Sequence, residues 1–271
     1  LAYALLTIFF WSTVATAFKL TLNYLDFLPL VFYASLVSML VLAVVCMLTG
    51  RFAQLGQWKR GDYLRSLFLG ALNPALYYMV LFRAYELLPA QEAQVLNFTW
   101  PIVLTLFGVL FLGQRLSLAG AAAISVSFIG VIIIATRGDL LALQFSNLQG
   151  VLLALFSTLI WAGYWVINQR DQRDALLRLW LNFVSGVGWM AILMTFTGGW
   201  AIPPLNGLLG ATYIGLFEMS LAYFCWFQAL RLSPNVSLLN NMIFLTPFGS
   251  LLVIAWVLNE PIYGSTLLGL G

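Results

Sequence analysis

One acidic residue of this chain lies in a place where a charge is costly. Glu218 stands about halfway along the apolar stretch IGLFEMSLAYFCW, which covers residues 214–226. An ionisable group in such surroundings is a functional candidate, because an apolar medium strongly disfavours an unpaired charge. A carboxylate there could hold the amino group of a solute or carry a proton. The residue 145 positions earlier is Asn73, which Pro74 follows, so a second polar group is expected at the same depth.

Aromatic and amide side chains accompany these two residues in neighbouring apolar stretches. Together they predict a lined cavity, and aromatic walls with a few amides suit an amphipathic organic solute better than a bare ion. The alternative for each aromatic residue is packing or contact with lipid. The candidate solute-binding residues are Trp11, Asn73, Tyr77, Tyr78, Asn97, Trp100, Trp161, Trp165, Glu218, Tyr223 and Asn241.

Three prolines within apolar stretches are candidate hinges. Pro74, Pro101 and Pro247 each remove a backbone donor and permit a kink in a helix. Pro101 and Pro247 correspond to each other when the chain is shifted by 146 positions, so they are expected to open opposite ends of one cavity. The alternative is that proline is simply common in helices that cross membranes.

The amino-acid composition indicates what kind of protein carries these residues. Of 271 residues, 62% are hydrophobic and 8% charged, whereas soluble domains average roughly 45–50% and about 25%. A water-soluble globule is therefore excluded. The chain has no histidine, so we expect no histidine metal site, no HExxH motif and no serine nucleophile with a histidine base. No GxxxxGK motif is present either, and no cofactor, metal or nucleic acid is expected.

Apolar runs bounded by charges, Pro and Gly predict an all-α integral membrane protein with ten transmembrane helices. Most of the twelve basic residues fall in alternate loops, with only Lys19, Arg83 and Arg137 on the other side. The positive-inside rule therefore places both termini in the cytoplasm. The predicted spans are residues 1–22, 28–49, 64–86, 92–112, 117–136, 150–169, 176–197, 207–229, 237–258 and 262 onward.

Two halves of the chain resemble each other. A shift of 145 places residues 70–89 on residues 215–234 and pairs glycine, tyrosine and proline at one register, and a shift of 150 places Trp11 on Trp161. We expect two five-helix repeats, residues 1–137 and 138–271, the last helix being cut short. Because five is odd, the second repeat is inverted. Such repeats can expose one site to each side in turn; the alternative is a duplication that only makes a stable bundle.

The third to fifth predicted spans of each half carry the segments FRAYELLPAQEAQVLNFTWPIVLTLFGVLFLGQRLSLAG and FQALRLSPNVSLLNNMIFLTPFGSLLVIAWVLNEPIYG. Over its whole length the chain resembles the drug/metabolite transporter superfamily, in particular its EamA-type members and among them bacterial exporters of aromatic and other amino acids. The family usually has Glu after the fourth span of each repeat. Glu260 fits this pattern and Gln114 departs from it. The resemblance implies a cavity between spans 1–4 and 6–9, with spans 5 and 10 outside it.

We therefore expect a secondary transporter, not an enzyme, that exports amino acids or related metabolites across the bacterial inner membrane by alternating access. The alternatives are export of other metabolites or cationic drugs by proton antiport and, more remotely, an intramembrane enzyme. The acidic pair Asp171 and Asp174 lies among arginines and is expected to be a solvated charge cluster. The expected partners are a small-molecule solute and the lipid bilayer, with the chain as a monomer or weak homodimer.

Overall fold

The computed structural model describes residues 1–113, 118, 122, 125–126, 129–130, 133, 146–200, 202–232, 239 and 242–270. Within these residues every regular element is a helix, which confirms the all-α class. Seven helices in this part of the chain are long and apolar enough to cross a membrane, so the chain is a multi-pass membrane protein. They are Ala2–Leu22, Phe27–Leu48, Arg60–Leu87, Ala90–Leu112, Leu148–Asn168, Ala175–Thr197 and Leu205–Leu232. Most of the predicted span 117–136 lies outside the described residues.

Several of these spans are built from shorter helical pieces. The first part of the chain forms α1 (Ala2–Leu22), α2 (Phe27–Leu48), η1 (Arg51–Gln57), α3 (Arg60–Gly70), η2 (Ala71–Leu76), α4 (Tyr77–Leu87), α5 (Ala90–Asn97) and α6 (Trp100–Leu112). The later part forms α8 (Leu148–Gln169), α9 (Ala175–Thr197), α10 (Leu205–Tyr213), η3 (Ile214–Leu221), α11 (Ala222–Leu232), α13 (Leu245–Leu258) and α14 (Gly264–Leu270).

Local sequence fixes where the two long helices of the later part begin and end. The Asn147 Oδ1 atom accepts the Gly150 N–H at 2.9 Å, and the Asp174 Oδ1 atom accepts the Leu177 N–H at 2.9 Å. Each bond satisfies one of the free donors at a helix start. At the end of α9, Gly198 adopts φ 69°, a left-handed conformation that glycine reaches without a steric penalty.

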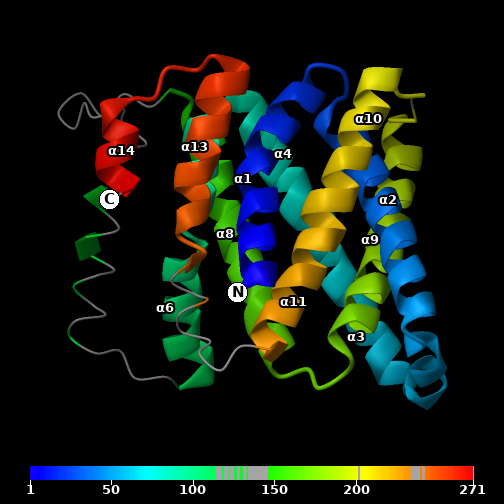
Figure 1. The fold of residues 1–271 in the computed structure, drawn as a ribbon. Helices are drawn as coiled ribbons and strands as arrows, with labels where there is room; N and C mark the ends of the chain where they lie inside the picture. Colours follow the sequence, from blue (N-terminus) through cyan, green and yellow to red (C-terminus); the bar gives the residue numbers. More distant parts are fainter. Residues whose placement is uncertain are drawn as a thin grey trace.

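Two spans, Arg60–Leu87 and Leu205–Leu232, are each made of three helical pieces, and we call them the broken spans. A shift of 145 positions places the first on the second. When α4 (Tyr77–Leu87) is moved by 145 positions it covers 222–232, the bounds of α11 (Ala222–Leu232). Figure 1 shows that the two run in opposite directions: α3 lies below α4, whereas α10 lies above α11. The register found by comparing the halves of the sequence therefore coincides with the helix boundaries.

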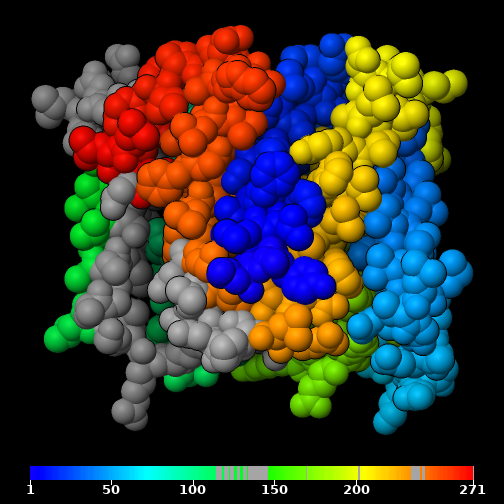
Figure 2. Space-filling view, in the orientation of Figure 1, coloured from blue at the N-terminus to red at the C-terminus, as the bar shows by residue number. Residues whose placement is uncertain are grey.

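The packing of the helices shows the same correspondence between the first and the later part of the chain. α1 packs against α11 and α13, while α8 packs against α4 and α6. α2 and α9 lie against each other, and each also contacts the broken span of the other half. In Figure 2, α1 forms the middle of one face, between α13 and the α10 to α11 span. Its exposed apolar side chains, such as Leu5, Leu6 and Phe9, suit contact with lipid.

Both broken spans change their backbone at the candidate polar residues. In η2, Asn73 is extended (φ −145°, ψ 119°) and precedes Pro74. In η3, which contains Glu218, the helix widens to a π-helical turn, a feature often found at functional sites. The two polar groups at matched positions are therefore both carried by irregular backbone.

In each broken span, a glycine allows close packing against a neighbouring helix. A methyl group on Gly70 would lie 2.3 Å from the Asn182 carbonyl oxygen of α9. A methyl group on Gly215 would lie 2.3 Å from the Ala34 carbonyl oxygen of α2. Backbones this close leave no room for a side chain, so Gly70 lets the end of α3 approach α9, and Gly215 lets η3 approach α2.

The other two candidate hinges lie near helix starts. Pro101 is the second residue of α6, which follows a break from α5 at Phe98 and Thr99. Pro247 is the third residue of α13. Proline is tolerated in the first turn because no intrahelical acceptor is lost there. The hinge role of these prolines stays a prediction.

Candidate functional site

A cavity lined mainly by aromatic side chains, with a few polar ones, lies among α1, α4, α5, α6, α8 and η3. Its volume is about 50 Å³, enough for one or two water molecules at about 30 Å³ each. The cavity is therefore too small for a metabolite, which would fit only if the helices around it moved apart. The lining residues are Trp11, Val14, Phe18, Tyr77, Leu81, Tyr85, Gln94, Asn97, Phe98, Trp100, Trp161 and Glu218.

Glu218 is the acidic member of this lining. Its side chain is buried, and its Oε1 atom accepts a hydrogen bond from the Tyr78 hydroxyl at 3.1 Å. Its Oε2 atom has no hydrogen-bond partner among the described residues. None of the lining residues named above is basic, so one carboxylate oxygen is left for a donor or a positively charged group that enters the cavity.

Aromatic rings surround this carboxylate. The ring centroid of Trp161 lies 4.7 Å from that of Tyr77 and 5.9 Å from those of Trp165 and Tyr223. Trp11 approaches Tyr223 edge-on at 6.2 Å. The Nε1 atoms of Trp11 and Trp165 lack hydrogen-bond partners in the described part of the chain. Such a wall can stack on a flat or apolar solute body and can attract a cation through its ring faces.

Amide side chains form the remaining polar lining. Asn97 donates from Nδ2 to the Ser157 hydroxyl at 2.9 Å and accepts from the Tyr77 hydroxyl at 3.4 Å. Gln94 accepts from the Tyr85 hydroxyl at 2.6 Å. These bonds fix the amides and the tyrosine rings relative to one another, so that the cavity wall is pre-organised.

The structure brings most of the predicted site residues together. Trp11, Tyr77, Asn97, Trp100, Trp161 and Glu218 line the cavity directly. Tyr78, Trp165 and Tyr223 contact lining residues. Asn73 is buried but is not among the lining residues, and Asn241 lies outside the described residues.

Sequence reasoning missed other lining residues. Val14 and Phe18 follow Trp11 at helical spacings of three and seven, and that periodicity could have identified them. Tyr85 belongs to the lining because the chain reverses direction at Pro89 between α4 and α5, which brings its hydroxyl to 2.6 Å from Gln94 of α5. That close approach of two helices is a tertiary property without a local signal.

Two charged side chains bind backbone groups around the turn from α4 to α5. The Lys19 Nζ atom donates to the carbonyl oxygens of Tyr85 and Leu88 at 2.6 and 2.7 Å. The Glu260 carboxylate accepts the N–H groups of Ala90 and Gln91 at 3.1 and 3.5 Å. Lys19 thus ties α1 to the end of α4, and Glu260 caps α5 from the segment after α13.

Charged residues join the two parts of the chain at the other end of the bundle. Asp171 pairs with Arg173 at 2.6 Å, Arg65 at 3.4 Å and Arg178 at 3.5 Å. Asp174 pairs with Arg51. The side chain of Asp171 is only 2% exposed, so the prediction of a solvated charge cluster is wrong for this residue. Sequence alone could not show that α3 would cover it.

The electrostatics of Asp171 follow from these arginines. Burial alone would raise the pKa of its carboxyl group, but hydrogen bonds from Arg173 and the nearby charges of Arg178 and Arg173 lower it to about 2. Groups of His, Cys, Asp or Glu that could hold a metal ion are absent from the described residues. This cluster therefore fits a structural ion-pair network.

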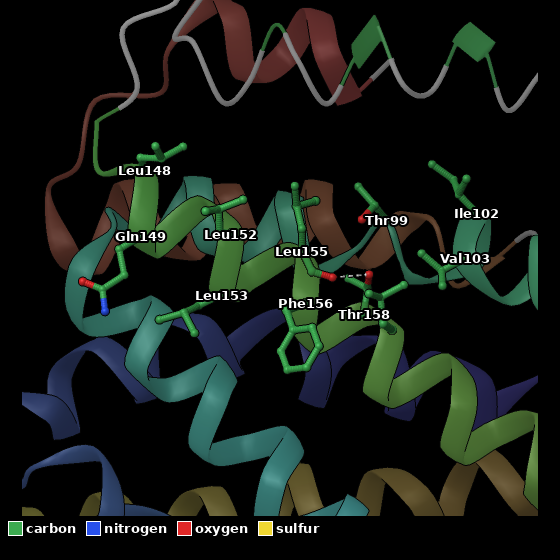
Figure 3. A pocket seen from close by; sticks show the side chains of 11 residues that line it. Thr99, Ile102, Val103, Leu148, Gln149, Leu152, Leu153, Leu155, Phe156 and Thr158 are labelled. Carbon is green, nitrogen blue, oxygen red and sulfur yellow. Dashed lines mark hydrogen bonds between the residues drawn. The ribbon is translucent and has the colours of Figure 1, made fainter.

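An apolar groove of about 810 Å³ lies between α8 and the break from α5 to α6. Figure 3 shows its leucine and phenylalanine side chains, together with the bond from the Thr158 hydroxyl to the Leu155 carbonyl oxygen at 2.6 Å. The Thr99 hydroxyl is likewise bonded within its own chain segment, to the Leu96 carbonyl oxygen at 2.8 Å. With no charged residue in its lining, this groove is a poorer candidate solute site than the cavity at Glu218.

The helical fold and its apolar spans define a membrane protein that encloses a buried carboxylate in an aromatic cavity. The EamA-like transporter family matches residues 1–136 and 148–271 of the chain. The chain therefore belongs to this family and is a transporter, not an enzyme.

Individual relatives are distant. The chain is 25% identical over 210 residues to protein PecM of Dickeya dadantii, covering 76% of this chain and 69% of that protein. It is 23% identical to an uncharacterized transporter of Archaeoglobus fulgidus over 98% of this chain and 92% of that one. It is 27% identical to the uncharacterized transporter YvbV of Bacillus subtilis over 73% and 65% of the two chains. A crystal structure with a TM-score of 0.70 and 19% identity covers 99% of this chain and 91% of its own, which shows the shared fold.

Proposed function

We propose that this chain is a secondary transporter that exports amino acids or related small metabolites across the bacterial inner membrane. The observation that carries the proposal is the carboxylate of Glu218, one oxygen of which has no partner among the described residues and which lines an aromatic cavity. An amino group can bind that oxygen, and the rings around Trp161 can hold the apolar part of the solute. Membership of the EamA-like transporter family supports this reading.

The proposed mechanism is alternating access by ten helices arranged as two inverted five-helix repeats, residues 1–137 and 138–271, with both termini in the cytoplasm. Support comes from the match between α4 and α11 and from their opposite directions. The broken helices at Asn73 and Glu218 provide places where half-helices can tilt. Because the cavity holds only about 50 Å³, solute binding must be coupled to a separation of the helices.

Export of cationic solutes by proton antiport is the second candidate. The observation that favours it is the absence of a basic residue from the named cavity lining, where Glu218 has no cationic partner. A positively charged solute would supply that partner. A solute that carries both charges requires further donors for its carboxylate.

Transport by the purified full chain in liposomes tests the proposal. The vesicles are loaded with one of a panel of amino acids, nucleosides or cationic drugs, and efflux is followed with and without a pH gradient. We expect efflux of neutral and aromatic amino acids above that of protein-free vesicles. Efflux of nucleosides alone, or of nothing in the panel, would contradict the proposed substrate class.

A further inference from the structure

Two serine hydroxyls bond the π-helical turn of η3, which carries Glu218, to helix α2. The Ser38 hydroxyl of α2 donates to the Met219 carbonyl oxygen at 2.8 Å. The Ser220 hydroxyl lies 2.9 Å from the Ser38 hydroxyl oxygen and 2.7 Å from the Gly215 carbonyl oxygen, and it can donate to either. Both serines are buried. We call Ser38 and Ser220 the serine pair.

The backbone of η3 is wider than an α-helix at this point. The Ala222 N–H bonds the Phe217 carbonyl oxygen, five residues back, whereas an α-helix would pair it with the carbonyl of Glu218, four residues back. Return to α-helical geometry would shift the register by one residue. Because successive α-helical residues are about 100° apart, the Glu218 side chain would then rotate by about that angle relative to α11. The widened turn therefore determines where Glu218 points.

The matching turn of the other broken span is built differently. A shift of 148 places the first residue of α2 on the first residue of α9 and places Ser38 on Gly186. The shift of 145 between the broken spans places Pro74 on Met219. A methyl group on Gly186 would lie 2.6 Å from the Pro74 ring, so glycine makes room for the proline that breaks η2. In η3, which has no proline, the Ser38 hydroxyl stands at the matched position.

The Ser38 hydrogen bond also differs from those of other hydroxyls in these helices. Hydroxyl groups within helices often bond their own backbone, and Thr21 and Ser157 donate to carbonyl oxygens of their own helices at 2.7 and 2.6 Å. Ser38 instead donates to a residue 181 positions away, next to Glu218. Its hydroxyl therefore fixes η3 relative to α2.

We propose that Ser38 is a positioning residue for the solute site and that, with Ser220, it holds the π-helical turn that presents Glu218 to the cavity. This inference rests on the proposed function, in which Glu218 holds the amino group of the solute. Tyr78 fixes one oxygen of the Glu218 carboxylate, and the serine pair fixes the backbone beside it. Ser38 is not among the lining residues named above, so it acts through Glu218.

The test is a double-mutant cycle on phenylalanine transport by the full chain in liposomes. Ser38→Ala removes the hydroxyl and should raise KM for phenylalanine about fivefold, the effect of one lost hydrogen bond. In the Glu218→Gln background the same replacement should change KM less than about twofold, because the side chain that the turn positions no longer carries a charge. An equal rise in both backgrounds would show a merely structural role and overturn the proposal.

Amide hydrogen exchange gives a readout that does not depend on transport. Ser38→Ala should speed exchange across η3 about fivefold, because the turn loses one hydrogen bond. Ser35→Ala is the matched control: Ser35 lies three residues earlier on α2, is also buried, and its hydroxyl lies 3.9 Å from the Met219 sulfur. It should change neither exchange nor KM by more than about twofold. Unchanged exchange across η3 in Ser38→Ala would overturn the proposal.

A second variant keeps the test valid if Ser38→Ala does not assemble. Ser220→Ala removes the other hydroxyl of the serine pair and should raise KM for phenylalanine in the same way, again only where Glu218 is present. A KM equal to that of the wild type in the serine variants would overturn the proposal. Failure of the wild type to transport phenylalanine would instead contradict the proposed function, and the exchange comparison would still show whether Ser38 holds the turn.

Discussion

The Tyr78 hydroxyl donates to the Glu218 carboxylate at 3.1 Å, joining two residues 140 positions apart. Tyr78 belongs to α4 in the first part of the chain, and Glu218 belongs to η3 in the second. The bond therefore links the two broken spans across the centre of the bundle. It holds one carboxylate oxygen in place, while the other has no hydrogen-bond partner in the part of the chain that the structure describes.

Replacement of Glu218 by Gln should abolish most solute transport while the protein still assembles. Glutamine keeps the size of the side chain and can still accept from Tyr78, but it has no charge to attract an amino group. We expect transport in liposomes to fall at least about tenfold, as expected for one lost hydrogen bond to a charged group. Glu86→Gln is the control, because Glu86 pairs with Arg83 at 2.5 Å outside the cavity. Wild-type activity of Glu218→Gln at every pH would remove Glu218 from the mechanism.

Replacement of both Trp161 and Trp165 by Ala should weaken transport of aromatic solutes more than that of small ones. Trp161 stands in contact with rings from three other helices and lines the cavity. We expect a rise in KM for phenylalanine that exceeds the rise for alanine. The matched control replaces Trp189 and Trp256, which are 42% and 83% exposed. Equal losses for both solutes would instead indicate damaged packing.

Much of the fold could be predicted because it depends on local patterns. Apolar length predicts the described spans, and the internal shift of 145 matches Asn73 with Glu218. The backbone breaks at these two residues were not predicted beyond a hinge at Pro74. The π-helical turn of η3 contains no proline, so it has no local signal comparable to the one at Pro74.

The site could be predicted only in part. Aromatic residues in the middle of spans, such as Trp11 and Trp161, are predictable because the position of a residue along one apolar segment gives its depth in the membrane. The bond from Asn182 to the Tyr164 hydroxyl could not be predicted, because it depends on how α8 and α9 pack together. The same limit explains the wrong prediction for Asp171, whose burial is set by α3 and its own arginines.

Replacement of Glu260 by Ala should lower the stability of the protein. The Glu260 carboxylate accepts the first N–H groups of α5, and loss of a helix cap costs about 0.5–2 kcal/mol. Glu260→Gln retains an oxygen acceptor and should lose less. Thermal unfolding in detergent compares the two variants, and equal melting temperatures for both variants and the wild type would show that the cap does not stabilise α5.

The ion pairs of Asp171 should make stability depend on acid pH. Its folded pKa of about 2 lies below the unfolded value of about 3.9. The ionised form therefore contributes stability, on the order of 2 kcal/mol, that is present above pH 4 and lost as the pH falls toward 2. The difference in melting temperature between wild type and Asp171→Asn should shrink over that range. A difference that stays constant from pH 7 to pH 2 would contradict this account.

The central claim is that one cavity opens to each side of the membrane in turn. It is tested most directly by a single cysteine at Val14, a lining residue, in a chain whose own Cys46 and Cys225 are replaced by Ala. An impermeant thiol reagent is applied to either side of the membrane, with Lys59→Cys and Gly199→Cys as markers of the two faces. We predict that Val14→Cys is labelled from both sides, whereas each marker is labelled from one side only and the two from opposite sides. Labelling of Val14→Cys from a single side under all solute conditions, or of both markers from the same side, would contradict the claim.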